Sequence, residues 1–189
     1  LKRLYLNNCN KIVELAPISE CKELISLHLD GCESIRYVCA LAGCKRLQHL
    51  SLKQCIILEN MTGLEQCREL RHLVLRGCLR LRCVAPLSGC VRLIGLNLIA
   101  CEGLESLHGL EGCCHLSKIN VDFCRSLTDV SALGQCKNLS EASFVCCTTL
   151  SDVSILIKCQ KLSMVDLSGC STLTKQHIGN IRGGLPLCK

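Results

Sequence analysis

A leucine recurs every 23 residues along this chain, and this interval constrains the fold more than any other feature of the sequence. These leucines are Leu1, Leu24, Leu47, Leu70, Leu93, Leu116, Leu139 and Leu162. Apolar residues follow three and five places after each of them, and a cysteine follows eight places after each, from Cys9 to Cys170. The unit LxxLxLxxCxxLxxVxxLxxCxx has seven full copies and an eighth that diverges after Leu173. A unit this short cannot bury its apolar face alone, so neighbouring units must stack into a solenoid.

Two spacings occur within each unit. The LxL segment alternates between inward and outward side chains, which is typical of a short β-strand. From the first cysteine onward every third residue is apolar, and this spacing favours 3₁₀ turns or extended chain. We therefore predict a repeat solenoid of the α/β type. It would be an arc with a short-stranded parallel sheet on its concave side, strands about 4.8 Å apart, and 3₁₀ or extended turns on its convex side.

Several stretches resemble the leucine-rich repeat family. "LNLIACEGLESL" and "VDLSGCSTLT" resemble its LxxLxLxxN/C signature, with cysteine in the Asn/Cys position. "GCKRLQHLSLKQC" resembles the cysteine-containing type, although the repeat is 23 residues long and that type often runs longer. "CRSLTDVSALGQCKNL" and "CTTLSDVSILIKCQKL" look most like repeats of large trypanosomatid leucine-rich repeat proteins. The family resemblance covers residues 1–174.

The repeats define the domain organisation. Those starting at 1, 24, 47, 70, 93, 116, 139 and 162 form one array over residues 1–174. Residues 175–189 diverge from the repeat, and the three-residue separation of Ile178 and Ile181 predicts a helix or a cap there. The chain begins in mid-pattern, so we expect it to be a fragment of a longer protein.

Fifteen of the 20 cysteines lie in two columns of the repeat, one headed by Cys9 and the other by Cys21. A zinc site is disfavoured because no CxxC pair occurs. A disulfide framework is disfavoured because each cysteine would have equivalent neighbours above and below. We therefore predict buried thiols, with the first column donating to backbone carbonyls after each strand and the second filling the corner before the next strand. So many thiols predict a reducing intracellular compartment, cytoplasm or nucleus, and Cys146 and Cys188 are the candidates for exposed thiols.

Motifs for chemistry are missing from the sequence. It has no glycine-rich phosphate loop, no GxSxG and no HExxH, so we predict no enzyme, no catalytic or metal-ligating residues and no cofactor. No apolar run approaches 18 residues, so we expect no membrane partner. Nucleic acid is an improbable partner because aromatic residues make up 2% of the chain and the net charge is only +6.

The outward positions of each LxL segment vary from repeat to repeat, as expected of a surface built for one partner. The positive excess lies in residues 1–92, which hold 14 Lys or Arg against 8 Asp or Glu. Arg80 and Arg82 would extend this basic patch, and the later repeats present acidic residues instead. The candidate contact residues are Arg3, His28, His49, Lys53, Arg71, His72, Arg76, Lys118, Asp122, Glu141 and Asp166. Asp129 and Asp152 are expected to cap the turns that follow them.

These observations predict a non-enzymatic scaffold that binds a protein partner on its concave face, with an acidic surface on that partner. Two alternatives stay open. The family resemblance implies a substrate-receptor arm of a ubiquitin ligase, with an F-box or RING segment outside this sequence. A structural component of a large assembly, contacted along the edges of the array, is the other. The oligomeric state does not follow from the sequence.

Overall fold

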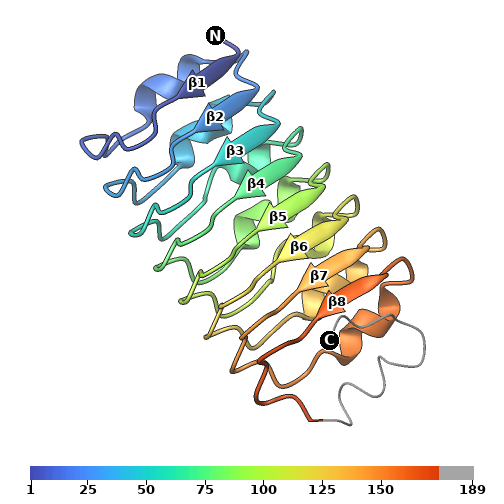
Figure 1. The fold of residues 1–189 in the computed structure, drawn as a ribbon. Helices are drawn as coiled ribbons and strands as arrows, with labels where there is room; N and C mark the ends of the chain where they lie inside the picture. The colour runs from blue at the N-terminus through green and yellow to red at the C-terminus, as the bar shows by residue number, and fades with distance from the viewer. Residues whose placement is uncertain (175–189) are drawn as a thin grey trace.

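A computed structural model describes residues 1–174, and it contains one parallel sheet of eight three-residue strands. The strands run in sequence order from one end of the molecule to the other (Figure 1). They are β1 (Arg3–Tyr5), β2 (Ser26–His28), β3 (His49–Ser51), β4 (His72–Val74), β5 (Gly95–Asn97), β6 (Lys118–Asn120), β7 (Glu141–Ser143) and β8 (Met164–Asp166). Each strand pairs with the next in a register of 23 residues, as in Leu50 with Leu73. We call each turn of this solenoid a rung.

Seven 3₁₀ segments form a second row behind the sheet (Figure 1). They are η1 (Ala16–Glu20), η2 (Cys39–Gly43), η3 (Leu64–Gln66), η4 (Ala85–Gly89), η5 (Leu110–Gly112), η6 (Ser131–Gln135) and η7 (Ser154–Lys158). The predicted fold class is thereby confirmed, with the sheet on the concave side and 3₁₀ turns on the convex side. The helix or cap predicted for 175–189 lies outside the described residues.

The three-residue period of the return segment follows from its backbone hydrogen bonds. In the second rung the amides of Cys32 and Ile35 donate to the carbonyls three residues earlier, at 3.1 and 3.2 Å. The amides of Leu41, Cys44 and Leu47 do the same at 2.9 to 3.0 Å. Each such turn directs the residue that closes it toward the interior. Every third residue must therefore be apolar.

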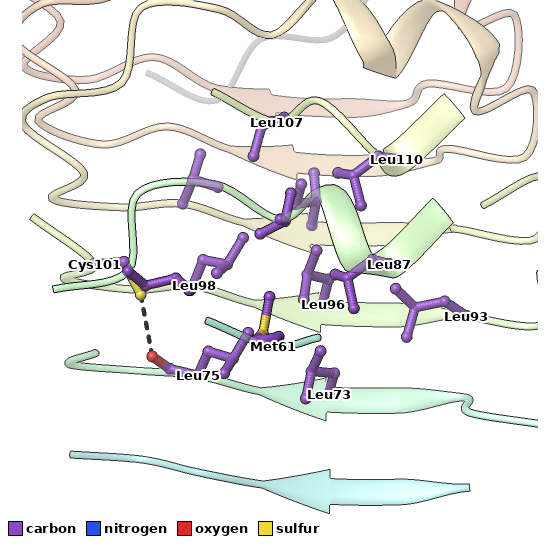
Figure 2. Close-up of a cluster of buried hydrophobic side chains, with 14 of the residues drawn as sticks. Met61, Leu73, Leu75, Leu87, Leu93, Leu96, Leu98, Cys101, Leu107 and Leu110 are labelled. Carbon is purple, nitrogen blue, oxygen red and sulfur yellow. Dashed lines mark hydrogen bonds between the residues drawn. The ribbon is translucent and has the colours of Figure 1, made fainter. Parts of the chain in front are cut away.

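The interior is one continuous aliphatic cluster that runs the length of the array. Its members are nearly all fully buried, including Leu73 at 1% exposure and Leu96 at 3%. Figure 2 shows Leu73, Leu75, Leu96 and Leu98 of two adjacent rungs facing Met61 and Leu87 of the return segments. Because each rung contacts only the rungs beside it, a side chain lost from one rung leaves a cavity bordered by just two neighbouring rungs.

Both cysteine columns donate hydrogen bonds from one rung to the one before. In the first column Cys101 Sγ lies 3.1 Å from the carbonyl oxygen of Leu75 (Figure 2). The same hydrogen bond, in which donor and acceptor are 26 residues apart in the sequence, recurs at Cys32, Cys55, Cys78, Cys124, Cys147 and Cys170. The predicted role of this column is confirmed.

The second column does more than fill a corner. Cys67 Sγ donates to the carbonyl of Leu41 at 3.3 Å, and the bond recurs at Cys44, Cys90, Cys113, Cys136 and Cys159. The Leu41 carbonyl also accepts the amide of Cys44 at 2.9 Å. Each acceptor therefore serves a turn within its own rung and a thiol of the next.

The residue before each first-column cysteine adopts a left-handed backbone conformation. These residues are Asn8, Gly31, Gln54, Gly77, Ala100, Phe123, Cys146 and Gly169. Their φ angles lie between 57° for Ala100 and 77° for Gly77. Glycine adopts this conformation freely, whereas Ala100 and Phe123 pay a steric cost, since their Cβ atoms approach the following carbonyl. The turn is thus imposed by the rung and not by the residue that occupies it.

Candidate functional site on the sheet face

The outward side chains of β1 to β8 form the sheet face, the surface on which we predicted partner contacts. Seven of the candidate residues are strand residues. Arg3, His49, His72, Lys118 and Glu141 are the first residues of their strands, and His28 and Asp166 are the third residues of theirs. Lys53, Arg76 and Asp122 lie two residues beyond their strands, and Arg71 directly precedes β4. The structure therefore places all eleven candidates on or beside this face, although it does not bring them into one site.

Stacked rings occupy the sheet face over the first four rungs. The imidazole of His49 stacks on that of His72, with ring centroids 5.2 Å apart and 7° between the planes. The Tyr5 ring stacks on His28 at 4.7 Å, and His28 Nε2 lies 3.0 Å from Ser26 Oγ. The 23-residue register places each pair on adjacent strands. These rungs present flat, rigid rings to an incoming partner.

Unpaired positive charge surrounds the rings. Within residues 1–174, Arg3, Arg71 and Arg76 make no ion pair. Burial lowers the pKa of His49, and the nearby His72, Arg71, His28 and Arg3 lower it further. Arg71 is half-buried, and its Nε atom is buried without a hydrogen-bond partner. We call Arg3, Arg71 and Arg76, together with the His49 and His72 rings beside them, the cationic cluster; its charge lies on the three guanidinium groups.

Several other predicted charges are paired within the array. Lys53 Nζ lies 3.4 Å from Asp30 Oδ2, and Lys118 Nζ lies 2.7 Å from Glu141 Oε1. Arg80 and Arg82 were expected to extend the basic patch, but they pair with Glu59 and Glu105 at 3.3 and 3.2 Å. Arg80 and Arg82 therefore do not extend the basic patch as expected, because these carboxylates offset the charges of the two guanidinium groups.

The predicted acidic residues of the later rungs hold the backbone. Asp122 Oδ1 accepts the Ser143 hydroxyl at 2.5 Å and the Val145 amide at 2.8 Å. Asp166 Oδ1 accepts the Ser168 amide at 2.9 Å. These carboxylates satisfy amides left free where the strands end. The acidic half of the face is therefore less available to a partner than its sequence suggests.

A hollow of about 330 Å³ opens on the sheet face between β4 and β8. Gly95 is among its lining residues, and the lack of a side chain there separates His72 from Lys118. Leu73, Leu96, Ile119 and Ala142 are among its lining residues, together with Asn97, Asn120, Ser143, Glu141 and Met164. The sequence analysis missed it, although glycine in an outward column of otherwise larger residues was the available signal.

Two further predictions concern residues outside the sheet face, namely the turn caps and the exposed thiols. Asp129 Oδ1 accepts the Ser131 amide at 2.9 Å, and Asp152 Oδ1 accepts the Ser154 amide at 2.8 Å, which confirms both predicted caps. Cys39, Cys83 and Cys114 are the exposed thiols of the described chain. Cys146 is only partly exposed, contrary to expectation, and Cys188 lies outside the described residues.

Two kinds of site are missing from residues 1–174. No three His, Cys, Asp or Glu side chains gather there as a metal site would require. Nor is any helix in that range long and apolar enough to cross a membrane.

Comparison with known proteins gives the fold. No protein-family model and no curated protein matches this chain. Internalin C2 from Listeria monocytogenes is similar in structure, with a TM-score of 0.74 and 17% identity over 98% of this chain and 80% of that one. The leucine-rich repeat domain of the type III effector XopL has a TM-score of 0.65 and 18% identity, over 98% and 75%. The chain therefore has the fold of leucine-rich repeat proteins. Its resemblance to the cysteine-containing type and to trypanosomatid proteins stays a prediction.

Proposed function

We propose that this chain is a non-enzymatic scaffold that binds a protein partner on its sheet face. One observation carries the proposal: on a scaffold whose interior repeats almost without change, the cationic cluster stands on the open face with three guanidinium groups that lack ion pairs. Several other arginines of the array pair with a glutamate of a neighbouring rung, as Arg92 does with Glu69 at 2.5 Å. Guanidinium groups left without carboxylates are suited to a partner that supplies them.

The partner in this proposal has an acidic surface. Arg3, Arg71 and Arg76 each offer donors in the planar geometry that binds a carboxylate through two hydrogen bonds. The stacked rings of His49 and His72 add apolar contact area beside those charges. Association should accordingly be faster at low salt, because exposed charges steer the encounter.

A second candidate, a component of a large assembly, is favoured by apolar side chains away from the sheet face. Val13 is 63% exposed and Tyr37 is 52% exposed, and both line a hollow with Cys39 and Ala40 beside η1 and η2. Exposed apolar side chains of this size commonly mark a contact surface. A ubiquitin-ligase receptor arm would use the sheet face in the same way, with the captured partner as its substrate.

We also propose a reducing compartment for this protein, cytoplasm or nucleus. The support is chemical, because all 19 described cysteines are free thiols and both columns use the S–H group as a donor. Oxidation would remove that donor from each rung it affected.

The proposal is tested by capture from a lysate of the source cell on two variants, each with three substitutions to glutamate. The first carries Arg71→Glu, His72→Glu and Arg76→Glu on the sheet face. The second carries Lys22→Glu, Lys45→Glu and Arg68→Glu, three exposed cations that recur at one repeat position off that face. Circular dichroism and urea midpoints establish that both are folded.

A partner that is lost by the first variant and kept by the second is the expected result. A partner kept equally by both would contradict the proposal. Loss on the second variant alone would move the contact to the edge of the array and favour the assembly component.

A further inference from the structure

One residue that lines the hollow on the sheet face has no side chain. Gly95 stands between His72 and Lys118 in the outward column of the sheet. A Cβ atom built on Gly95 would lie 3.1 Å from His72 Nδ1, so even one methyl group would crowd the imidazole. The backbone at Gly95 does not have the left-handed φ of the glycines at the turns. A side chain at this position would therefore have to displace the exposed His72 imidazole slightly, while the backbone conformation does not call for glycine.

The floor of the hollow is strand backbone, and its outward side chains are both apolar and polar. Leu73, Leu96, Ile119 and Ala142 expose 1 to 3% of their surfaces, so their side chains belong to the core and close the hollow from behind. Met164 lines it as well and is 40% exposed, and its flexible thioether can adapt to a guest. The apolar side chains that a guest in the hollow could cover are therefore those of Val74 and Met164.

The rim offers hydrogen bonds to a peptide backbone. Asn97 Oδ1 accepts the Ile99 amide at 3.1 Å, and its amide nitrogen makes no hydrogen bond within residues 1–174. Lys118 and Glu141 hold each other at 2.7 Å on the opposite side of Gly95. A backbone crossing the rungs would therefore meet a free donor at Asn97 and a neutralised pair at Lys118.

The cationic cluster borders this hollow. His72 belongs to both, since it stacks on His49 and lines the hollow. Adjacent rungs of a parallel sheet lie about 4.8 Å apart, so the centre of the cluster at β3 and β4 lies roughly 10 Å from the centre of the hollow at β5 and β6. An extended peptide advances about 3.3 Å per residue, so roughly three residues span the separation.

We propose that the sheet face binds an extended peptide segment with two anchors about three residues apart. A large apolar side chain, such as leucine, methionine or phenylalanine, enters the hollow over Gly95. A carboxylate of aspartate or glutamate contacts Arg71, Arg76 and His72. This inference rests on the proposed function and names the chemistry of the partner. Charge complementarity is the argument for the acidic anchor, and the apolar side chains of the lining are the argument for the apolar anchor.

The test uses random twelve-residue peptides displayed on phage and selected on the intact chain. Enriched peptides are then synthesised, and their affinities are measured by fluorescence anisotropy on four variants. Gly95→Leu fills the hollow, and Gly95→Ala is its smaller control. Arg71→Gln with Arg76→Gln removes the charges, and Lys22→Gln with Lys45→Gln is the control of equal charge.

We expect the enriched peptides to share an acidic residue and a large apolar residue that are about three positions apart in the peptide sequence. Gly95→Leu should weaken binding at least tenfold, and more than Gly95→Ala does. Exchanging the peptide's acid for its amide should weaken binding about fivefold to wild type, and by less to the Arg71→Gln and Arg76→Gln variant, which keeps only His72 to contact the carboxylate.

Enriched peptides without this pair, equal binding to Gly95→Leu, or no enrichment at all would overturn the inference. None of these results bears on the proposed function, because a folded partner captured from the lysate can contact the same cations without inserting a side chain. Conversely, a captured partner that ignores the sheet-face variant would overturn the proposed function whatever the peptides show.

Discussion

The interior of this array and its sheet face follow opposite rules. Inside, a leucine or cysteine in one rung is replaced by the same residue in the next, and the Sγ–H bond of Cys101 to Leu75 is repeated with little variation along the stack. On the sheet face, the position held by His72 in one rung is held by Gly95 in the next and by Lys118 after that. The interior fixes geometry, and the face is free to differ.

The difference also shows where the face is already used by the array itself. Asp122 and Lys118 look like binding residues in the sequence, yet one holds amides of the following rung and the other pairs with Glu141. Arg3, Arg71 and Arg76 have no such partner within residues 1–174. The face therefore holds two kinds of charged group: those that pair within the scaffold, and those that make no ion pair within the described residues.

Alkaline pH should have the largest effect, and it should act through the interior alone. Burial raises the pKa of five interior thiols to about 12, namely those of Cys55, Cys67, Cys113, Cys136 and Cys147. The unfolded chain releases these protons near pH 9, so its proton count falls first and stability is lost as pH rises from about 9 toward 12. These five thiols alone should cost roughly 5 kcal/mol between pH 9 and pH 10, about 1 kcal/mol each. Urea midpoints measured in reductant from pH 7 to 10.5 test this.

Two substitution sets separate interior from exposed thiols in that measurement. Cys39→Ser with Cys83→Ser and Cys114→Ser should leave the alkaline loss unchanged. Cys55→Ala with Cys147→Ala should make the dependence on pH shallower, by two titrating groups. If the exposed set controls the slope instead, the interior thiols are not protected as described.

Shortening a core leucine should cost far more than shortening its outward neighbour on the same strand. Leu73→Ala is expected to lower the free energy of unfolding by about 2–5 kcal/mol, because the adjacent rungs cannot collapse into the cavity. His72→Ala should change it by about 1 kcal/mol or less, since His72 is exposed. Denaturant unfolding of both variants checks the pair, and equal costs would show that interior and face are not distinct.

Substitutions at the left-handed turn positions should change the free energy of unfolding by a smaller amount, with opposite signs at Ala100 and Gly77. Ala100→Gly should stabilise the array by about 0.5–1 kcal/mol, because glycine removes the steric cost of a φ near 57°. Gly77→Ala should destabilise it by about 1 kcal/mol, since its φ is 77° and the new Cβ would crowd Gln54. Thermal unfolding measures both, and a loss of stability in Ala100→Gly would refute the assigned turn.

The sequence was sufficient for whatever recurs with the 23-residue period. Strand register, 3₁₀ return segments, burial of Leu73 and the caps at Asp129 and Asp152 all follow from spacing and residue type. Each of them depends on contacts within a rung or on a repeat of the same residue one rung away.

Features that depend on unlike residues in neighbouring rungs were harder to predict. The pairing of Arg82 with Glu105 sits at an offset of one repeat, so comparison one rung ahead could have found it. The left-handed φ of Phe123 has no local signal, because the fold imposes a conformation that the side chain disfavours. The hollow at Gly95 depends on the absence of a side chain and the size of its neighbours, which the pattern of leucines does not report.

The central claim is that the cysteine columns form the scaffold from buried, hydrogen-bonded thiols, leaving the sheet face as the variable surface. It is tested most directly by pulse labelling the native protein with a thiol reagent and reading each cysteine by mass spectrometry. We predict that Cys39, Cys83 and Cys114 react within the pulse, while Cys55 and Cys101 react only when the array opens. Labelling of Cys55 or Cys101 as fast as Cys83 in the folded protein would contradict the account.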